Sequence, residues 1–172
     1  RVEAVGRNVT QFQVGDDVFG CIPLHELGSF AEYVCAHEDA LALKPANLSF
    51  EEAAAVPSAG VTALQGLRDK GQIQPGQKVL INGASGGVGT FAVQIAKSFG
   101  TEVTGVCSTR NVDMVRSIGA DQVIDYAQED FTRNGTRYDL ILDVKTNRSI
   151  FDYARALSPN GTYVTVGGEL GR

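Results

Sequence analysis

The stretch that decides the fold is Lys78-Val79-Leu80-Ile81-Asn82-Gly83-Ala84-Ser85-Gly86-Gly87-Val88-Gly89. It begins as an apolar strand, passes through a glycine-rich turn and opens a segment whose apolar residues recur at helical spacing as far as Gly100. In the turn, Ala84, Gly86 and Gly89 stand at the three fixed places of the G-x-G-x-x-G pattern. Between a strand and an amphipathic helix, such a turn offers backbone amides at a helix N-terminus to a pyrophosphate. The stretch therefore predicts a dinucleotide-binding unit.

The chain from Pro75 onward repeats this alternation of strand and helix. We expect Asn111 to cap the second connecting helix, with Asp113 in its first turn and Gly119 at its end. The expected strands are Lys78–Asn82, Glu102–Cys107, Gln122–Tyr126, Tyr138–Val144 and Thr162–Gly167. Such an alternation is typical of a parallel sheet covered on both faces. The predicted fold class is α/β, a Rossmann-type doubly wound parallel sheet with five of its six strands present.

The first third of the chain has a different pattern. From Val14 to Pro45 the sequence favours β structure, and the stretch Phe30–Cys35 is rich in strand formers. These strands are too few to close a barrel or sheet, so we expect residues before Arg1 to supply the rest. Beyond them, capping-box spacing at Ser49-Phe50-Glu51-Glu52 predicts a short helix that Pro57 ends, and a second helix that stops at Gly71.

The residues after the second predicted strand indicate which cofactor is bound. NAD-binding relatives of this fold place an acidic residue there, about 20 residues beyond the turn, to bind the adenosine ribose hydroxyls. Here the strand ends in Ser108, Thr109 and Arg110, which offer two hydroxyls and a guanidinium to a 2′-phosphate. This favours NADPH. The alternative is that Arg110 is an ordinary solvated residue at the start of a helix.

Composition narrows the classes of partner. A net charge of -5 over 172 residues gives no basic stripe for a nucleic acid, and no apolar run approaches the roughly 18 residues of a membrane helix. The three cysteines, Cys21, Cys35 and Cys107, have no C-x-x-C spacing, which suits neither a thiolate zinc site nor a disulfide framework. We expect a cytoplasmic protein that binds neither nucleic acid nor membrane.

Several motifs resemble the medium-chain dehydrogenase/reductase superfamily, in its zinc-independent, quinone-oxidoreductase-like branch. They are Gly15-Asp16-Asp17-Val18-Phe19-Gly20, Ala53-Ala54-Ala55-Val56-Pro57, Gly60-Val61-Thr62-Ala63-Leu64 and the glycine-rich turn itself. The resemblance covers nearly the whole chain and implies an internal fragment of a longer protein. It assigns residues 1–46 to a partial GroES-like substrate domain and residues 47–172 to an NADP-binding Rossmann domain truncated at its C-terminal end. It also implies that the full-length form is a homodimer.

The resemblance extends to the cofactor contacts. It implies Thr62 near the nicotinamide, Gly87 and Val88 at the pyrophosphate, and Ser108, Arg110 and Tyr126 around the 2′-phosphate, although Tyr126 is equally typical of a packing residue. The predicted cofactor site comprises Thr62, Ala84, Ser85, Gly86, Gly87, Val88, Gly89, Ser108, Thr109, Arg110, Tyr126, Val144, Val166, Gly167 and Gly168. The last four lie at strand ends expected to line the nicotinamide ribose. Lys145-Thr146-Asn147 stands where the family has a glycine-containing loop.

No metal site is expected. Zinc-dependent relatives carry a four-cysteine lobe after the Gly-Asp-x-Val turn, but only ten residues separate Val18 from Ser29, and Ser58 stands at a ligand position. Cys21 and His25 are interpreted as a small hydrophobic residue and a surface imidazole.

The expected reaction is transfer of hydride from NADPH to a quinone or an α,β-unsaturated carbonyl, with no catalytic residue assigned. The fragment alone is expected to be inactive. The alternative is a non-catalytic NADPH-binding sensor or scaffold module.

Overall fold

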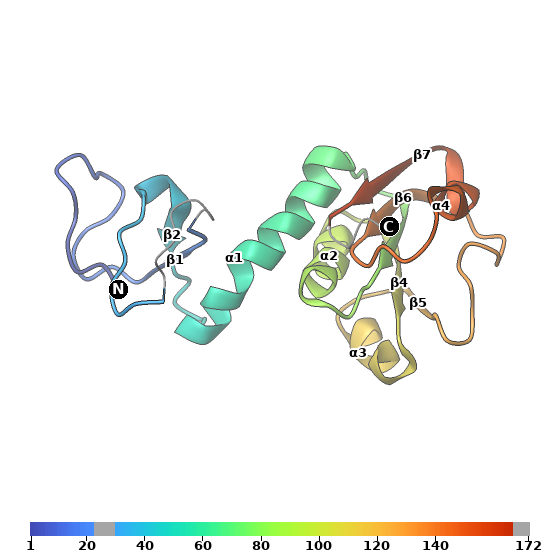
Figure 1. The fold of residues 1–172 in the computed structure, drawn as a ribbon, viewed down its shortest axis with the longest axis horizontal. Coiled ribbons are helices and arrows are strands. Elements are labelled where there is room, and N and C mark those ends of the chain that lie inside the picture. The colour runs from blue at the N-terminus through green and yellow to red at the C-terminus, as the bar shows by residue number, and fades with distance from the viewer. Residues whose placement is uncertain (23–29, 167–172) are drawn as a thin grey trace. The chain divides into compact units, whose positions relative to one another are not determined.

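The chain folds into two compact units, Arg1–Ser58 and Ala59–Arg172 (Figure 1). The structure, a computed structural model, describes residues 1–22 and 30–166. The predicted division between residues 46 and 47 stays a prediction.

The second unit is built on a five-stranded parallel sheet. Its strands lie in the order β5-β4-β3-β6-β7, with every neighbouring pair parallel. Their bounds are β3 (Lys78–Asn82), β4 (Glu102–Cys107), β5 (Gln122–Asp125), β6 (Tyr138–Asp143) and β7 (Leu157–Thr165). This order confirms the predicted fold class. β3 and β4 have the predicted bounds, whereas β5 and β6 each end one residue earlier than expected.

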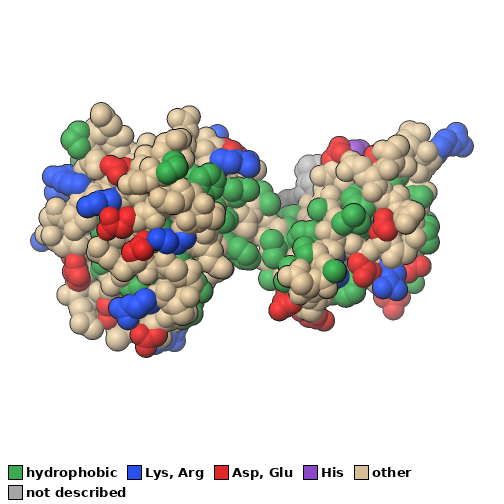
Figure 2. Space-filling view, turned by 180° about the vertical axis from the view of Figure 1, so that it is seen from behind, with side chains coloured by type: hydrophobic (Ala, Val, Ile, Leu, Met, Phe, Trp, Pro, Cys, Tyr) green, Lys and Arg blue, Asp and Glu red, His purple; other side chains and the backbone are tan. Residues whose placement is uncertain are grey.

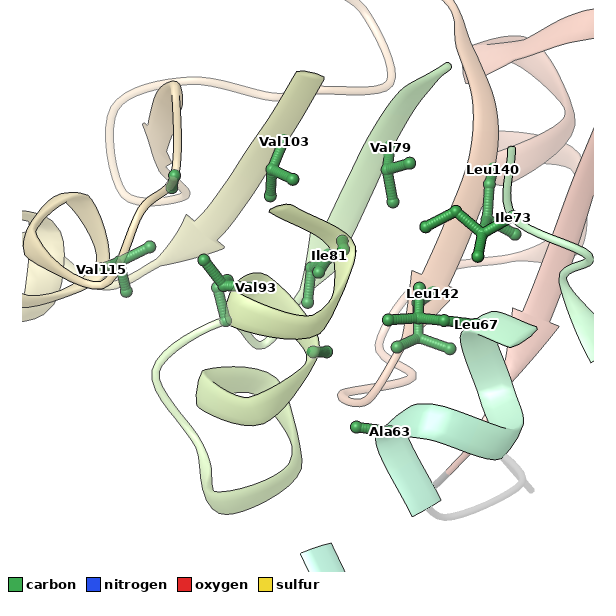
Figure 3. Packing of buried hydrophobic residues seen from close by; sticks show 14 of the residues in the cluster. Ala63, Leu67, Ile73, Val79, Ile81, Val93, Val103, Val115, Leu140 and Leu142 are labelled. Atoms are coloured by element: carbon green, nitrogen blue, oxygen red, sulfur yellow. The ribbon is translucent and has the colours of Figure 1, made fainter. Parts of the chain in front are cut away.

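Helices cover both faces of this sheet because its central strands are apolar on both sides. The helical elements of this unit are η3 (Gln65–Lys70), α2 (Gly87–Ser98), η4 (Thr109–Asn111), α3 (Val112–Ser117) and α4 (Ile150–Ala156), together with the part of α1 (Phe50–Leu64) from Ala59 onward. Ile81 of β3 belongs to one core cluster with Leu67 of η3, Val93 of α2 and Val115 of α3, as Figure 3 shows. Leu80, the neighbour of Ile81 in β3, belongs to a second cluster on the other face, together with residues of α4. Burial of one such side chain stabilises the fold by about 1.5–3 kcal/mol.

The last strand differs from its prediction. β7 begins at Leu157, whereas Thr162 was the expected start. Leu157 is in register with Tyr138 and Thr162 with Leu140, so no residue of β6 is paired with residues 158–161. A Cβ atom on Gly161 would lie 2.8 Å from the carbonyl oxygen of Tyr138. The sequence Pro159-Asn160-Gly161 therefore makes an irregularity within the strand.

The prediction that Pro57 ends a helix was wrong. α1 runs through Pro57 to Leu64 and continues as the π-helical turn η3, which Gly71 closes as predicted. A proline inside a helix removes one backbone hydrogen bond, but alanines on both sides of it have high helix propensity. The expected capping box at the start of this helix is present: Ser49 N–H donates to Glu52 Oε2 at 2.8 Å, and Glu52 N–H donates to Ser49 Oγ at 3.1 Å.

The first unit contains one short antiparallel pair, β1 (Val18–Gly20) with β2 (Leu41–Leu43), and the 3-10 turn η2 (Glu38–Ala40). The strand expected from the composition of Phe30–Cys35 was wrong, because these residues form no regular element. Within the described residues no strand pairs with them, and strand formers without a partner strand gain no ladder hydrogen bonds.

Candidate functional site

The glycine-rich turn is folded tightly against the sheet. Gly83 has a φ of 87°, which favours glycine, and the N–H groups of Gly83 and Ala84 donate to the carbonyl oxygen of Val106 at 3.1 and 3.0 Å. A Cβ atom on Gly89 would lie 2.1 Å from the carbonyl oxygen of Gly83. Helix α2 can therefore approach the turn this closely only because residue 89 is glycine.

The opposite side of the turn is open. Gly86 and Gly87 are exposed, and a Cβ atom on Gly86 would meet no described atom closer than 3.5 Å. Gly86 is also the N-cap of α2, and no side chain caps this helix. Because the first N–H groups of a helix have no partner within it, this terminus offers donors and the positive end of the helix dipole to an anion.

A cavity of about 290 Å³ lies beside this open turn. Its lining combines backbone of the turn, hydroxyl and amide groups, and two cationic side chains, Arg110 and Lys145. The lining residues are Asn82, Gly83, Ser85, Gly86, Val106, Cys107, Ser108, Arg110, Asn111, Tyr126, Val144, Lys145 and Asn147. No Asp or Glu of the described residues is among them, so the cavity favours anions in a chain whose net charge is negative.

Six residues of the predicted cofactor site line this cavity. They are Ser85, Gly86, Ser108, Arg110, Tyr126 and Val144. Tyr126 is 57% exposed, which argues against the alternative that it is a packing residue. Gly87 and Val88 lie beside the cavity in the first turn of α2.

The structure places the other predicted residues outside the lining. Ala84 and Gly89 are buried behind the turn, and Thr62 is half-buried in α1. Val166 packs against the core. Thr109 donates its hydroxyl to Asp125 Oδ2 at 2.6 Å. Gly167 and Gly168 lie outside the described residues, as does His25.

Asn111 has a different role from the predicted one. It does not cap α3 with its side chain. Its Nδ2 donates instead to Ser85 Oγ at 3.1 Å and to Ser108 Oγ at 3.2 Å. One amide thus links the glycine-rich turn to the residue after β4, and all three residues line the cavity. Sequence spacing could not reveal this bridge, because Ser85 and Asn111 are 26 positions apart.

An acidic residue that the sequence analysis did not consider stands near the cavity. Asp125 ends β5 in register with Cys107 of β4. The hydroxyl of Thr109, the N–H of Ala127 and the amide of Gln128 all donate to its carboxylate and keep its pKa below the usual value. Burial, followed by the charge of Asp125, raises the pKa of the Cys107 thiol. Asp125 therefore opposes part of the attraction that Arg110 exerts on a phosphate.

A buried polar network supports the other wall of the cavity. Asp143 ends β6, is fully buried, and accepts hydrogen bonds from Asn82 Nδ2 at 2.8 Å and from the Tyr163 hydroxyl at 2.7 Å. Asn82 Nδ2 also donates to the Lys145 carbonyl oxygen at 2.9 Å and to the Tyr153 hydroxyl at 3.1 Å. The residues after β6 are thus fixed to the end of β3.

This network changes the acidity of its tyrosines. Burial, together with the neighbouring Asp143 carboxylate, raises the pKa of Tyr163 to about 12. The same two causes raise the pKa of Tyr153. Both phenols therefore stay protonated at neutral pH and act as donors or neutral acceptors.

Within residues 1–22 and 30–166, no three His, Cys, Asp or Glu side chains are grouped so that they could hold a metal ion. No helix in the described part of the chain is long and apolar enough to cross a membrane. On the face that Figure 2 shows, acidic and basic side chains of the second unit are interspersed.

The chain is similar to several known proteins. A family model described as zinc-binding dehydrogenase matches residues 87–172, half of the chain. The 2-methylene-furan-3-one reductase of Solanum lycopersicum is 38% identical over 98% of this chain and 49% of its own length. The mitochondrial NAD(P)H oxidoreductase RTN4IP1 of Mus musculus is 38% identical over 80% of this chain and 37% of its own.

Among solved structures, the quinone oxidoreductase from Coxiella burnetii has a TM-score of 0.83 and 36% identity, over 92% of this chain and 50% of its own. The chain spans about half the length, or less, of the relatives it matches.

Proposed function

This chain belongs to the medium-chain dehydrogenase/reductase superfamily, and from that premise we propose that it holds NADPH at the open turn and its cavity. The full-length protein then transfers hydride from NADPH to a quinone or an α,β-unsaturated carbonyl, without zinc. The relatives establish an NAD(P)H oxidoreductase family with quinone oxidoreductase and enone-type reductase members. The choice of NADPH, the acceptor and the independence from zinc are the proposal.

The observation that carries the proposal is the cavity with its open helix N-terminus. Gly87 and Val88 belong to the first turn of α2, whose unpaired amides suit a pyrophosphate, and the space around Gly86 supports its approach. Ser108 and Arg110 stand at the end of β4, where the adenosine ribose lies in this fold, and offer a hydroxyl and a guanidinium. When bound there, the nicotinamide supplies the hydride, and the protein supplies binding and orientation.

Within residues 1–22 and 30–166, the side chains do not fit a zinc ion. Zinc in proteins takes three or four thiolate, imidazole or carboxylate ligands. Of the three cysteines, Cys21 and Cys35 are exposed and far apart in sequence, and Cys107 is buried with a raised pKa, which disfavours the thiolate form. Ser58, at the position of a ligand in zinc-dependent relatives, offers only a hydroxyl.

Hydride transfer without a Lewis acid requires an acceptor that is already electrophilic. Quinones and conjugated carbonyls meet this requirement, because the charge that develops on oxygen is delocalised. The names of the relatives refer to acceptors of these two kinds, a quinone and an unsaturated furanone. This supports the proposed acceptor class and does not select a compound within it.

The test uses the protein in its natural full length with NADPH and a panel of quinones and enals. We expect NADPH absorbance to fall only when protein and acceptor are both present, and to fall at the same rate after treatment with a zinc chelator. Loss of turnover on chelation would contradict zinc independence. Tight NADPH binding without turnover on any acceptor would support the alternative, a sensor or scaffold module.

A further inference from the structure

We propose that the ammonium group of Lys145 is a second phosphate contact of the dinucleotide site, and that it binds the bridging pyrophosphate and not the adenosine 2′-phosphate. This inference rests on the proposed function, because it names a residue of the same site. It concerns a position where the resemblance to the family predicts a glycine-containing loop and this chain has a lysine.

Hydrogen bonds fix the backbone of Lys145 beside the glycine-rich turn. Its carbonyl oxygen accepts from Asn82 Nδ2 at 2.9 Å, and its N–H donates to Asp143 Oδ1 at 3.3 Å. A Cβ atom on Gly83 would lie 3.1 Å from the Cβ atom of Lys145. The side chain of Lys145 therefore starts in contact with the first residue of the turn that holds the pyrophosphate.

The side chain is also free to reach a ligand. Lys145 is exposed, lines the cavity together with Ser85 and Gly86, and makes no ion pair with any described residue. Asp143 is the nearest acidic residue in sequence, but its carboxylate is buried and already accepts from Asn82, Tyr163 and the Lys145 N–H. A cation that faces an anion-binding turn with no internal partner is suited to pair with the anion itself.

The order of the strands separates the two cations of the cavity. Arg110 follows β4 and Lys145 follows β6, with β3 and its turn between them. Neighbouring strands lie about 4.8 Å apart, so the ends of β4 and β6 are roughly 10 Å apart. Arg110 is therefore on the side of the 2′-phosphate, whereas Lys145 lies on the opposite side of the central pyrophosphate. The first contact distinguishes NADPH from NADH, and the second is common to both.

The experiment compares NADPH and NADH titrations of the full-length wild-type protein with those of Lys145→Met, Lys145→Arg and Lys78→Met. Met keeps the length of the side chain and removes its charge. Lys78 is exposed and starts β3, at the end of the sheet away from the cavity, so Lys78→Met is the matched control for net charge. Inorganic pyrophosphate, titrated by calorimetry, serves as a probe that carries neither adenosine nor nicotinamide.

We expect Lys145→Met to lower the affinities for NADPH and NADH by the same factor, about fivefold to tenfold for an exposed charged contact. The affinity for pyrophosphate should fall by a similar factor. Lys145→Arg should restore most of the lost affinity, and Lys78→Met should leave the affinities for all three ligands unchanged. Unchanged affinities in Lys145→Met, or a loss confined to NADPH, would overturn the inference.

The two proposals fail in different ways. If the wild type binds neither dinucleotide but binds pyrophosphate through Lys145, the proposed function is wrong and the anion contact stands. If dinucleotides bind equally well to the wild type and Lys145→Met, the proposed function stands and the inference is wrong. If the wild type binds none of the three ligands, both are wrong.

Discussion

The two sides of the glycine-rich turn use glycine for different reasons. On the inner side, Gly83 has a positive φ and Gly89 lies so close to Gly83 that any side chain would strike backbone. On the outer side, Gly86 and Gly87 are exposed, with ordinary backbone angles at Gly86 and no close neighbour at either position. Glycine on the inner side is required by the fold, whereas glycine on the outer side is required only if something else approaches.

This difference separates stability from binding within one short motif. A side chain on the inner side must shift backbone that two hydrogen bonds to Val106 hold in place. A side chain on the outer side disturbs nothing in the protein and occupies the space a ligand would take. A substitution on the inner side therefore tests stability, and one on the outer side tests ligand binding.

The largest effect is expected for Gly89→Ala. Its Cβ atom would lie 2.1 Å from the Gly83 carbonyl oxygen and 2.8 Å from two backbone atoms of Ala84. Overpacking against backbone should lower the free energy of unfolding by about 3 kcal/mol. Urea denaturation in the absence of cofactor measures this. An unchanged unfolding midpoint would show that α2 can move away from the turn without cost.

Gly86→Ala is the matched substitution on the outer side. The new Cβ atom meets only the Gly83 carbonyl oxygen, at an ordinary 3.5 Å, and the φ of -84° suits alanine. The free energy of unfolding should change by less than about 0.5 kcal/mol. NADPH affinity should fall on the order of tenfold, because the methyl group stands where the pyrophosphate approaches. Undiminished affinity would mean that the cofactor does not contact this side.

Arg110→Ala extends the comparison to the wall of the cavity beside β4. NADPH affinity should fall about tenfold while NADH affinity stays nearly unchanged, since only NADPH carries the 2′-phosphate. The expected loss of NADPH affinity is smaller than the full contribution of a charged hydrogen bond, because Arg110 is exposed and Asp125 is near. Ser108→Asp should reduce the preference further by repelling the phosphate. An equal loss for both cofactors would show that Arg110 is only a solvated residue.

Tyr163→Phe should change the way in which stability depends on pH in alkaline solution. The pKa of Tyr163 is raised from the usual value of 10 to about 12 in the folded protein. Between these values the unfolded chain loses the phenolic proton and the folded protein keeps it, so stability falls as pH rises through this window. In Tyr163→Phe this part of the decline should be absent. Identical alkaline unfolding profiles for the two proteins would contradict the raised pKa.

The sequence was sufficient where structure depends on local pattern. The apolar runs of β3 and β4 are buried on both faces and were found with their bounds, because no tertiary contact is needed to recognise them. Local pattern did not predict that Phe30–Cys35 form no strand, because a strand forms only where a partner strand is available. It also did not predict that α1 continues through Pro57, because the helix tolerates the loss of one hydrogen bond.

The lining of the cavity was predictable to a similar extent, and its role in cofactor binding stays a prediction. The glycine pattern located the turn, and the end of β4 supplied Ser108 and Arg110. Asn111 and Lys145 acquire their places from contacts that span 26 and 63 positions, and no motif records such contacts. Ala84 matched a place in the pattern but lies buried, because the pattern specifies residue type and not which way a residue faces.

The buried network at Asp143 also sets the order in which the site can be completed. Asn82 lines the cavity, yet its amide forms hydrogen bonds with residues 61 to 71 positions later in the chain. Asp143 likewise accepts a hydrogen bond from Tyr163, which is 20 positions later. During synthesis from the N-terminus, the turn emerges long before the strand that fixes its surroundings. Such distant contacts form late, because loop closure must precede them. A nascent chain therefore presents the glycine-rich turn first and acquires an ordered cofactor cavity only when β7 has docked.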